Sequence, residues 1–278
     1  PRASFNAVFA YMFGGLLRRV ACRLRPYECQ AGDVDQVLEV SLEILYEAFM
    51  GRIKKQDALA AVMERFEKIP VAKTERPKVA IFGDLYSRDN RVMNQDLIRF
   101  IERHGGEVVT TPYSDYARMI ANPYFRKWFY ERKFLTLISS KALMTTITRL
   151  ERTYYRLFEP LLGEPMATFD DPPEAILAQY GVRIEHTGES MDNILKIFYI
   201  IKHYPDISLF VQTSPAFCCP SLVTEAMVGE IERKTGIPIV SITYDGTGGL
   251  KNDIIIPYLK YPALKTVKPA TVQNREMR

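Results

Sequence analysis

Four short apolar runs, separated by segments with helical spacing, constrain the fold of this chain most strongly. They are KVAIFGDLY at 78–86, GGEVVTTPY at 105–113, DISLFVQTSP at 206–215 and IPIVSITYDG at 237–246. Strands that are apolar on both faces and alternate with helices are typical of a parallel sheet covered on both sides. Because crossovers between parallel strands are right-handed, we expect an α/β fold with a small Rossmann-like or flavodoxin-like parallel sheet.

The runs predict the bounds of the strands. A sheet of four or more parallel strands is expected to contain residues 79–85, 108–111, 209–212 and 239–243.

Helical spacing marks the N-terminal part of the chain. Three helices are expected there, over 4–24, 33–50 and 56–68, with Gly32 and Asp33 at the start of the second. Apolar residues at i, i+3 and i+4 spacing predict the core-facing stripe of that second helix. They are Val34, Val37, Leu38, Leu42, Leu45 and Phe49.

A long aromatic and basic segment separates the second and third predicted strands. Residues 115–162 have few breaking residues except Asn122 and Pro123, and they predict two or more inserted helices. The expected organisation is an N-terminal helical segment, 1–74, and an α/β domain, 75–278, with a helical insertion at about 114–163. The inserted aromatic residues are expected mainly to pack a helical cap.

Charge and hydropathy exclude two classes of partner. Lys and Arg number 37 against 33 Asp and Glu, and this net charge of +4 is not the strongly basic footprint of a nucleic-acid-binding protein. No apolar run reaches the roughly 18 to 20 residues that a membrane span needs. We therefore expect neither nucleic acid nor membrane as a partner, and a cytoplasmic location.

Cysteine usage points to thiols rather than disulfides. Four cysteines are too few for a disulfide scaffold in 278 residues, and a bridge between the adjacent Cys218 and Cys219 would be strained. Reduced thiols or metal ligands are the expected roles.

The loops at the carboxyl ends of the predicted strands are the expected places for a ligand. The loop that begins at Gly83 lacks the G-x-G-x-x-G spacing of a dinucleotide site. The loop YDGTGGLKND at 244–253 is glycine-rich, so its backbone N–H groups could approach an anion, although a plain turn is the commoner reading. The candidate cofactor-binding residues in this loop are Asp245, Gly246, Thr247 and Gly248.

The two adjacent cysteines lie in QTSPAFCCPSLVTEAM, residues 212–227, where a strand gives way to a helix. A thiolate at a helix N-terminus is stabilised by aligned backbone N–H groups, which favours a ligand or a nucleophile. Pro220 suits the first helical turn. Packing of Cys218 and Cys219 as small buried hydrophobic residues is the alternative, with equal weight on the residues alone.

Several long motifs, taken together, resemble a known family. FCCPSLVTEAM, IERKTGIPIVSITYDGTGG, RPYE and GDLYSRDN occur in the order and context of the C-terminal part of acyl-CoA dehydratase activase-related proteins. These are relatives of the subunits of 2-hydroxyacyl-CoA dehydratases and of double-cubane iron–sulfur proteins. The resemblance covers nearly the whole chain.

The resemblance implies a role in low-potential electron transfer. In this superfamily, cysteines from separate flavodoxin-like domains converge on one iron–sulfur cluster. The resemblance places Cys218 or Cys219 at a ligand position and Asp245 at the acidic position that ends the following strand. The implied partners are upstream domains or a partner subunit, an ATP-dependent activator and, as a candidate, acyl-CoA; whether the parent protein is an enzyme stays open.

The chain departs from the family pattern at the other cluster ligands. Neither Cys22 nor Cys29 matches a family ligand position. Because a [4Fe–4S] cluster takes about three or four thiolates, we expect this chain not to hold a cluster alone. We also expect one sulfur of the cysteine pair to lie in the core and that of Cys219 to face a cleft near Asp245.

Two other functions stay open. One is a CoA or nucleotide binding module that uses the Gly83 loop and the loop 246–249. The other is a non-catalytic interaction domain that docks through the aromatic segment 113–134.

Overall fold

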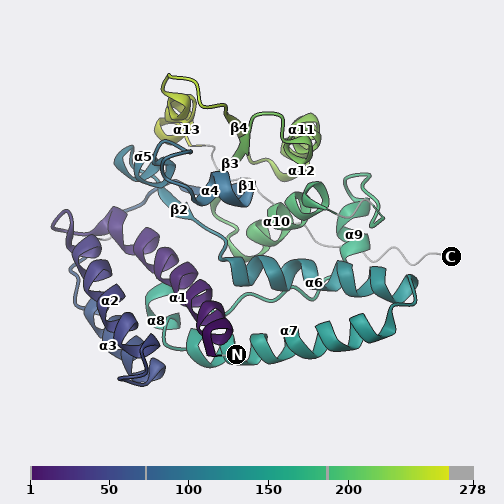
Figure 1. Ribbon diagram of the computed structural model, residues 1–278. Helices are drawn as coiled ribbons and strands as arrows, with labels where there is room; N and C mark the ends of the chain where they lie inside the picture. The colour runs from purple at the N-terminus through teal and green to yellow at the C-terminus, as the bar shows by residue number, and fades with distance from the viewer. Residues whose placement is uncertain (1, 73, 186–187, 263–278) are drawn as a thin grey trace. The chain divides into compact units, whose positions relative to one another are not determined.

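The structure of the protein is a computed structural model that describes residues 2–72, 74–185 and 188–262 (Figure 1). The chain divides into two compact units. Unit 1 comprises Pro1–Arg76, Val109–Arg118 and Phe134–Thr168, and unit 2 comprises Pro77–Val108, Met119–Lys133 and Phe169–Arg278. The segment predicted as one insertion is thus shared between the two units, and residues 263–278 of the predicted α/β domain lie outside the described residues.

Unit 1 is helical. Its three N-terminal helices agree with the predicted bounds to within two residues, and its core gathers Phe13, Leu16, Phe66 and Phe158, each at most 1% exposed. The helical elements of unit 1 are α1 (Arg2–Leu24), η1 (Arg25–Tyr27), α2 (Asp33–Phe49), α3 (Lys55–Glu67), α7 (Phe134–Tyr155) and α8 (Glu159–Leu162).

Glu28 of the RPYE motif caps α2. Its carboxylate accepts hydrogen bonds from the backbone N–H groups of Gly32 and Val34, both at 2.9 Å. Gly32 occupies the N-cap position with a φ of 100°, and no side chain at that position makes a capping bond. The first turn of α2 is therefore held by a side chain that precedes the helix, which satisfies N–H groups that have no partner inside it.

One residue of the stripe predicted for α2 is placed differently. Val34 and Leu45 are buried, whereas Leu42 is 58% exposed. With about 100° of rotation per residue, Leu42 lies at the margin of the stripe, beyond the reach of the core. The prediction that Leu42 packs in the core is wrong.

Unit 2 is built on a four-stranded parallel sheet with the order β2-β1-β3-β4. β1 pairs with β3 in parallel from Lys78↔Ile207 to Gly83↔Thr213, and β3 pairs with β4 from Phe210↔Ile239 to Pro215↔Tyr244. The predicted α/β class and parallel sheet are confirmed. The strands are β1 (Lys78–Gly83), β2 (Glu107–Val109), β3 (Ile207–Pro215) and β4 (Ile239–Tyr244).

The helices of unit 2 surround this sheet. α10 is buried along most of its length and packs against β1, α9 and α11. The helical elements are α4 (Leu85–Asp89), α5 (Leu97–Arg103), α9 (Pro173–Ala178), α10 (Glu189–His203), α11 (Cys219–Ala226), α12 (Val228–Thr235), η2 (Lys251–Ile255) and α13 (Ile256–Lys260).

α6 (Tyr113–Tyr130) begins in unit 1 and ends in unit 2. The expected break at Asn122 and Pro123 does not end it, because Pro123 is buried inside the helix and Asn122 Nδ2 donates to the carbonyl of Phe169 at 3.0 Å. Among the described residues, no helix combines the length and the apolar character that crossing a membrane would need.

Candidate functional site at the carboxyl edge of the sheet

The strand order gives unit 2 a topological switch point. β1 and β3 are neighbours, but the chain leaves β1 toward β2 on one side and leaves β3 toward β4 on the other. In open α/β sheets, ligands bind in the crevice where two neighbouring loops diverge in this way. The loops that begin at Gly83 and at Ala216 therefore frame the candidate site.

Gly83 brings the ends of β1 and β3 into close contact. It has a φ of 110°, and an added Cβ would clash with the carbonyl oxygen of Thr213 and lie 2.9 Å from its nitrogen. The N–H of Asp84 donates to that carbonyl at 2.9 Å, and the Asp84 carboxylate accepts from Ser87 N–H at 2.7 Å, which caps α4. Only glycine fits this backbone at Gly83.

The cysteine pair follows β3 at a turn into a helix. Phe217 adopts a left-handed conformation with a φ of 63°, Cys218 is the N-cap, and Cys219 is the first residue of α11. Pro220 follows in the first turn, where its missing N–H leaves no bond unmade. The predicted placement of the pair at a strand-to-helix junction is confirmed.

The two sulfurs differ in exposure. Cys219 is exposed, with its sulfur 3.9 Å from the carbonyl oxygen of Phe217. Cys218 is half-buried, and the Ser221 hydroxyl donates to its sulfur at 3.3 Å. The expectation that one sulfur lies in the core is therefore wrong, because the hydroxyl of Ser221 gives the less exposed sulfur a polar partner at the helix start.

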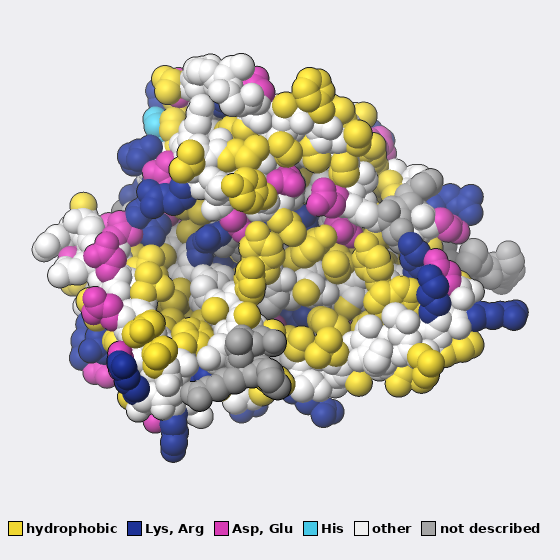
Figure 2. All heavy atoms as spheres, in the orientation of Figure 1, with side chains coloured by type: hydrophobic (Ala, Val, Ile, Leu, Met, Phe, Trp, Pro, Cys, Tyr) yellow, Lys and Arg dark blue, Asp and Glu magenta, His cyan; other side chains and the backbone are white. Residues whose placement is uncertain are grey.

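Exposed apolar side chains lie close to Cys219 in the sequence. Phe217 is 92% exposed, and Leu222 and Val223 on α11 are 56% and 48% exposed. Figure 2 shows hydrophobic side chains gathered over α11 on this face of unit 2. Exposed apolar side chains near an exposed thiol favour a site that another protein surface covers.

Lys196 lies at the same edge and was missed by the sequence reasoning. It is only 2% exposed, and its Nζ donates to the carbonyl of Gly83 at 3.2 Å and to Asn193 Oδ1 at 3.4 Å. Burial, and after it the nearby Arg88, lower the pKa of Lys196 to about 8, although Asp192 opposes both. A lysine that can lose its proton near neutral pH thus lies beneath the switch point.

A chain of hydrogen bonds joins Lys196 to the cysteine helix. Asn193, which accepts from Lys196, donates through Nδ2 to Thr224 Oγ1 at 3.1 Å, and Thr224 donates to the carbonyl of Pro220 at 3.0 Å. β1, α10 and the first turn of α11 are therefore connected by buried polar groups.

The sequence does hold a signal for Lys196. It is the single charged residue in the run ILKIFYII, residues 194–201, which is apolar on every side of the helix. Charged residues are rarely buried unless they are paired or functional, so a lone lysine in such a run indicates a special environment.

Asp245 is close to the end of β4 and is tied to its own loop. Its carboxylate accepts from Thr247 Oγ1 at 2.7 Å, from Thr247 N–H at 3.0 Å and from Lys251 Nζ at 3.1 Å. These bonds hold the pKa of Asp245 below its ordinary value, and the bond from the Thr247 hydroxyl has the largest effect. The carboxylate is thus an ionised acceptor that orders the loop.

The predicted cofactor residues Gly246, Thr247 and Gly248 lie in this exposed loop. The second half of the loop is fixed by Gln95, which donates to the carbonyl of Gly249 at 2.8 Å and accepts from Lys251 N–H at 2.9 Å. A loop that carries a carboxylate and already uses its Thr247 and Lys251 N–H groups is poorly suited to a phosphate group.

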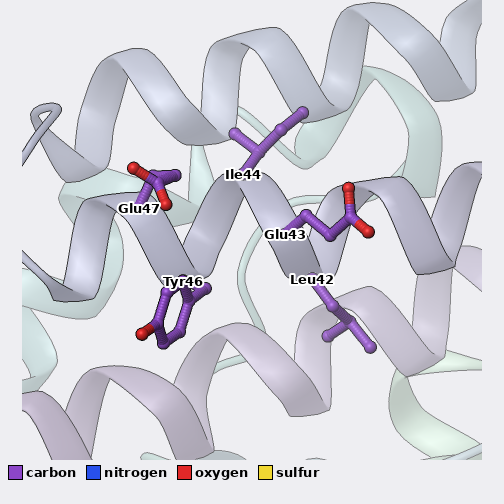
Figure 3. A pocket seen from close by; sticks show the side chains of 5 residues that line it. All are labelled: Leu42, Glu43, Ile44, Tyr46 and Glu47. Carbon is purple, nitrogen blue, oxygen red and sulfur yellow. The ribbon is translucent and has the colours of Figure 1, made fainter.

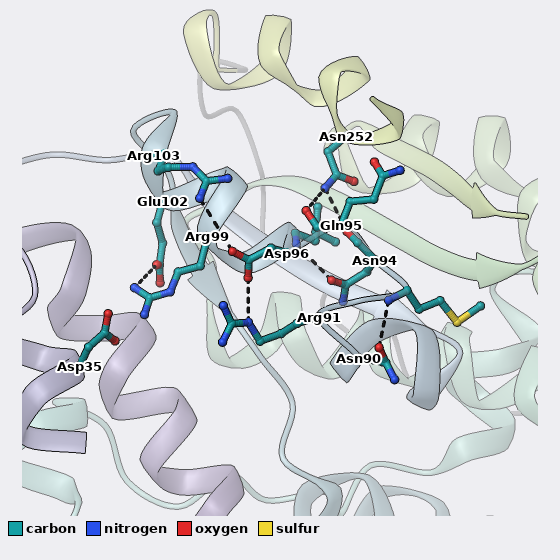
Figure 4. Close-up of polar contacts among 12 residues, drawn as sticks. Asp35, Asn90, Arg91, Asn94, Gln95, Asp96, Arg99, Glu102, Arg103 and Asn252 are labelled. Carbon is teal, nitrogen blue, oxygen red and sulfur yellow. Dashed lines mark hydrogen bonds and ion pairs between the residues drawn. The ribbon is translucent and has the colours of Figure 1, made fainter. Parts of the chain in front are cut away.

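Further hydrogen bonds join Asn252, in η2 after β4, to the segment that follows α4. Asn252 Nδ2 donates to the carbonyls of Asn94 and Gln95 at 3.0 and 3.1 Å (Figure 4). Tyr244 donates to Asn252 Oδ1 at 2.8 Å. These contacts favour a structural role for the loop 246–249, and its predicted role in cofactor binding stays a prediction.

The described residues do not complete a metal site. Within residues 2–72, 74–185 and 188–262, no three His, Cys, Asp or Glu side chains are grouped so that they could hold a metal ion. Cys22 is buried in α1 and Cys29 is exposed, and both belong to unit 1. An iron–sulfur cluster with about three or four thiolate ligands therefore does not fit the described residues by themselves.

Comparisons with protein-family models, with curated proteins and with solved structures found no match to this chain.

Proposed function

We propose that this chain is one part of an iron–sulfur electron-transfer protein and that it contributes Cys219 to a cluster shared with other domains. The observation that carries the proposal is the exposed Cys219 sulfur at the start of α11, at the carboxyl edge of a parallel sheet. A thiol there is open to a partner surface and adjoins the free N–H groups of a helix, which favour the thiolate.

Further support comes from the motifs that resemble 2-hydroxyacyl-CoA dehydratase-related proteins, in which such a cysteine joins ligands from separate domains. The incomplete ligand set among the described residues is consistent with a shared cluster. The proposal therefore includes upstream domains or a partner subunit as the source of the other ligands, and an ATP-dependent activator as the electron donor. Acyl-CoA is the candidate substrate class of the assembly.

The test is anaerobic isolation of the protein with all the domains and subunits that accompany it, followed by iron and sulfide analysis and EPR spectroscopy. Cys219→Ala is expected to lower the iron content and to change the EPR spectrum, because a cluster loses a ligand. Cys218→Ala is expected to have a smaller effect, since Ser221 already bonds that sulfur.

Cys29→Ala is the matched control, because Cys29 is also exposed but belongs to unit 1. It should leave both readouts unchanged. Iron content and EPR spectra that are the same in Cys218→Ala, Cys219→Ala and the unaltered protein would rule the proposal out.

A second candidate function is protein docking through the aromatic segment. Phe129 and Tyr130, at the end of α6, are 58% and 69% exposed, which favours a contact surface over a buried helical cap. A double substitution of both residues by Ser should abolish capture of a partner by this segment while leaving the iron content unchanged. If the double variant loses iron as well as the partner, the partner docked on this segment is needed for the cluster, and the two candidate functions are one.

A further inference from the structure

α2 presents an exposed face that is both apolar and acidic. Leu42 and Tyr46 are 58% and 57% exposed and leave α2 on the same side, with Glu43 and Glu47 beside them (Figure 3). Met50, one turn further along, is 51% exposed. Over its 17 residues α2 holds five acidic side chains and no basic one.

α7 presents an exposed face of the opposite charge. Leu135 and Ile138, in its first turns, are 87% and 66% exposed. Lys141, Arg149 and Arg152 follow on the same side of the helix, because they lie within about 100° of Ile138 at 100° per residue. The acidic residue of α7, Glu151, is buried, so the exposed face is basic and apolar.

Glu47 on the α2 face pairs with Arg52 at 2.6 Å, but other charges on these two faces have no ion-pair partner among the described residues. Within the described part of the chain, Glu39, Glu43, Lys141, Arg149 and Arg152 make no ion pair. Exposed apolar side chains next to charges of one sign are the composition of a contact surface with a polar rim.

The two faces are complementary in an antiparallel arrangement. On α2 the acidic residues come first and the apolar Met50 comes late, whereas on α7 the apolar Ile138 comes first and Arg149 and Arg152 come late. Antiparallel packing sets Glu39 and Glu43 opposite the arginines and Met50 opposite Ile138. It also aligns the helix dipoles favourably, and α7, with 22 residues, is long enough to cover the 17 residues of α2.

We propose that this protein self-associates through these faces, with α2 of one copy packed antiparallel on α7 of a second copy. A second copy is the occupant because both complementary faces are carried by the same chain, so every copy supplies both halves of the contact. The proposal is independent of the cysteine site, which belongs to unit 2.

Sedimentation velocity over a concentration series tests the proposal. The unaltered protein should associate, and raising the salt concentration should weaken the association because the charge pairs are near the surface. Glu43→Lys and Arg149→Glu should each raise the dissociation constant about tenfold, since each places like charges opposite each other.

Mixing the two variants separates a contact effect from a folding effect. Each variant alone has a like-charge pair, but Glu43→Lys and Arg149→Glu copies together restore opposite charges on both kinds of contact. The mixture should therefore associate more tightly than either variant alone. Glu67→Lys, at the end of α3, makes the same change of charge elsewhere in unit 1 and should leave association unaltered.

Two results would overturn the proposal. One is an unaltered protein that stays monomeric across the concentration series, which would mean that a second copy does not cover the α7 face. The other is association that Glu43→Lys, Arg149→Glu and their mixture leave unchanged.

Discussion

Unit 1 buries an acid and unit 2 buries a base, and the surroundings of the two groups differ. Glu151 is 1% exposed and lies beside Arg118, whose Nε is 3.1 Å from its carboxylate. Arg118 and Arg19 also pair with Asp115, so the acid belongs to a cluster of mixed charge. Lys196, in contrast, donates to the neutral oxygens of a carbonyl and an amide.

The difference separates a structural cluster from a candidate site. The unit 1 cluster draws on α1, α6 and α7, and its opposite charges hold these helices together. Lys196 lies at the strand ends where ligands bind, and burial disfavours its charge while Asp192, Glu189 and Asp84 favour it.

The two groups also give the two units opposite responses to pH. Burial raises the pKa of Glu151, so its contribution to stability is present below the ordinary value of 4.5 and is lost as the pH rises through the folded-state pKa. Burial lowers the pKa of Lys196 from 10.5 to about 8, so the unfolded chain binds the extra proton between these values. Unit 2 therefore gains stability as the pH rises from about 8 to 10.5, and that gain is absent below pH 8.

Gly83→Ala should have the largest effect and should act on unit 2. The added methyl group clashes with the Thr213 backbone in a left-handed conformation, and we expect a loss of about 3 to 5 kcal/mol in the free energy of unfolding. Hydrogen exchange resolved along the sequence measures each unit. Gly181→Ala, at a φ of 68° with open space around it, is the matched control and should cost about 1 to 2 kcal/mol. Equal losses in both units would show that the units do not unfold separately.

The gain in the stability of unit 2 between about pH 8 and 10.5 should be the next largest effect. A pKa that falls from 10.5 to about 8 corresponds to about 3 kcal/mol of unfolding free energy between these pH values. Lys196→Met keeps the length of the side chain and removes the proton, so it should flatten this pH dependence in denaturant titrations. If Lys196→Met still gains stability over this pH range, another group is responsible for the gain.

Changes at Glu151 should separate its charge from its bulk. Glu151→Gln keeps the shape and should cost about 1 kcal/mol or less below pH 4.5, because burial raises the pKa of Glu151 and favours the neutral acid. It should also abolish the loss of stability of unit 1 at rising pH. Glu151→Ala leaves Arg118 without this carboxylate and should cost about 3 kcal/mol, measured by urea denaturation. Equal costs for both variants would mean that packing alone matters at this position.

Thiol labelling should have no effect on stability, but it compares the units directly. Each unit holds one exposed cysteine, Cys29 in unit 1 and Cys219 in unit 2, and these two should react first with a thiol reagent. Cys218 should follow, and Cys22 should react only when unit 1 unfolds. Mass spectrometry of the labelled peptides gives the order, and early reaction of Cys22 would contradict the packing of α1.

The sequence predicted the elements of both units well because their signals are local. The helical spacing of 4–24, 33–50 and 56–68 and the apolar runs of the strands depend on residues within one element. The start of α2 was predicted correctly at Gly32 and Asp33, but the capping bonds of Glu28 were not, since Glu28 reaches forward from outside the helix. Leu42 was misplaced because the width of a buried stripe depends on the neighbours that cover it.

The candidate site was predicted in part. The end of β3, the following helix and Cys219 at its start could be read from Pro220 and the preceding apolar run. Lys196 could not be placed, because its position at the end of β1 depends on a contact between residues far apart in the sequence, 83 and 196. The bonds of the loop after Asp245 to Gln95 also join distant segments, which a local pattern does not reveal.

The pairing of β1 with β3 has a consequence for how the protein is made. Lys78 in β1 pairs with Ile207 in β3, so this edge of β1 stays open until more than 120 further residues have left the ribosome. β2, at 107–109, becomes available much sooner. During synthesis, β1 is therefore an apolar strand with one unpaired edge, through which nascent chains can pair wrongly with one another.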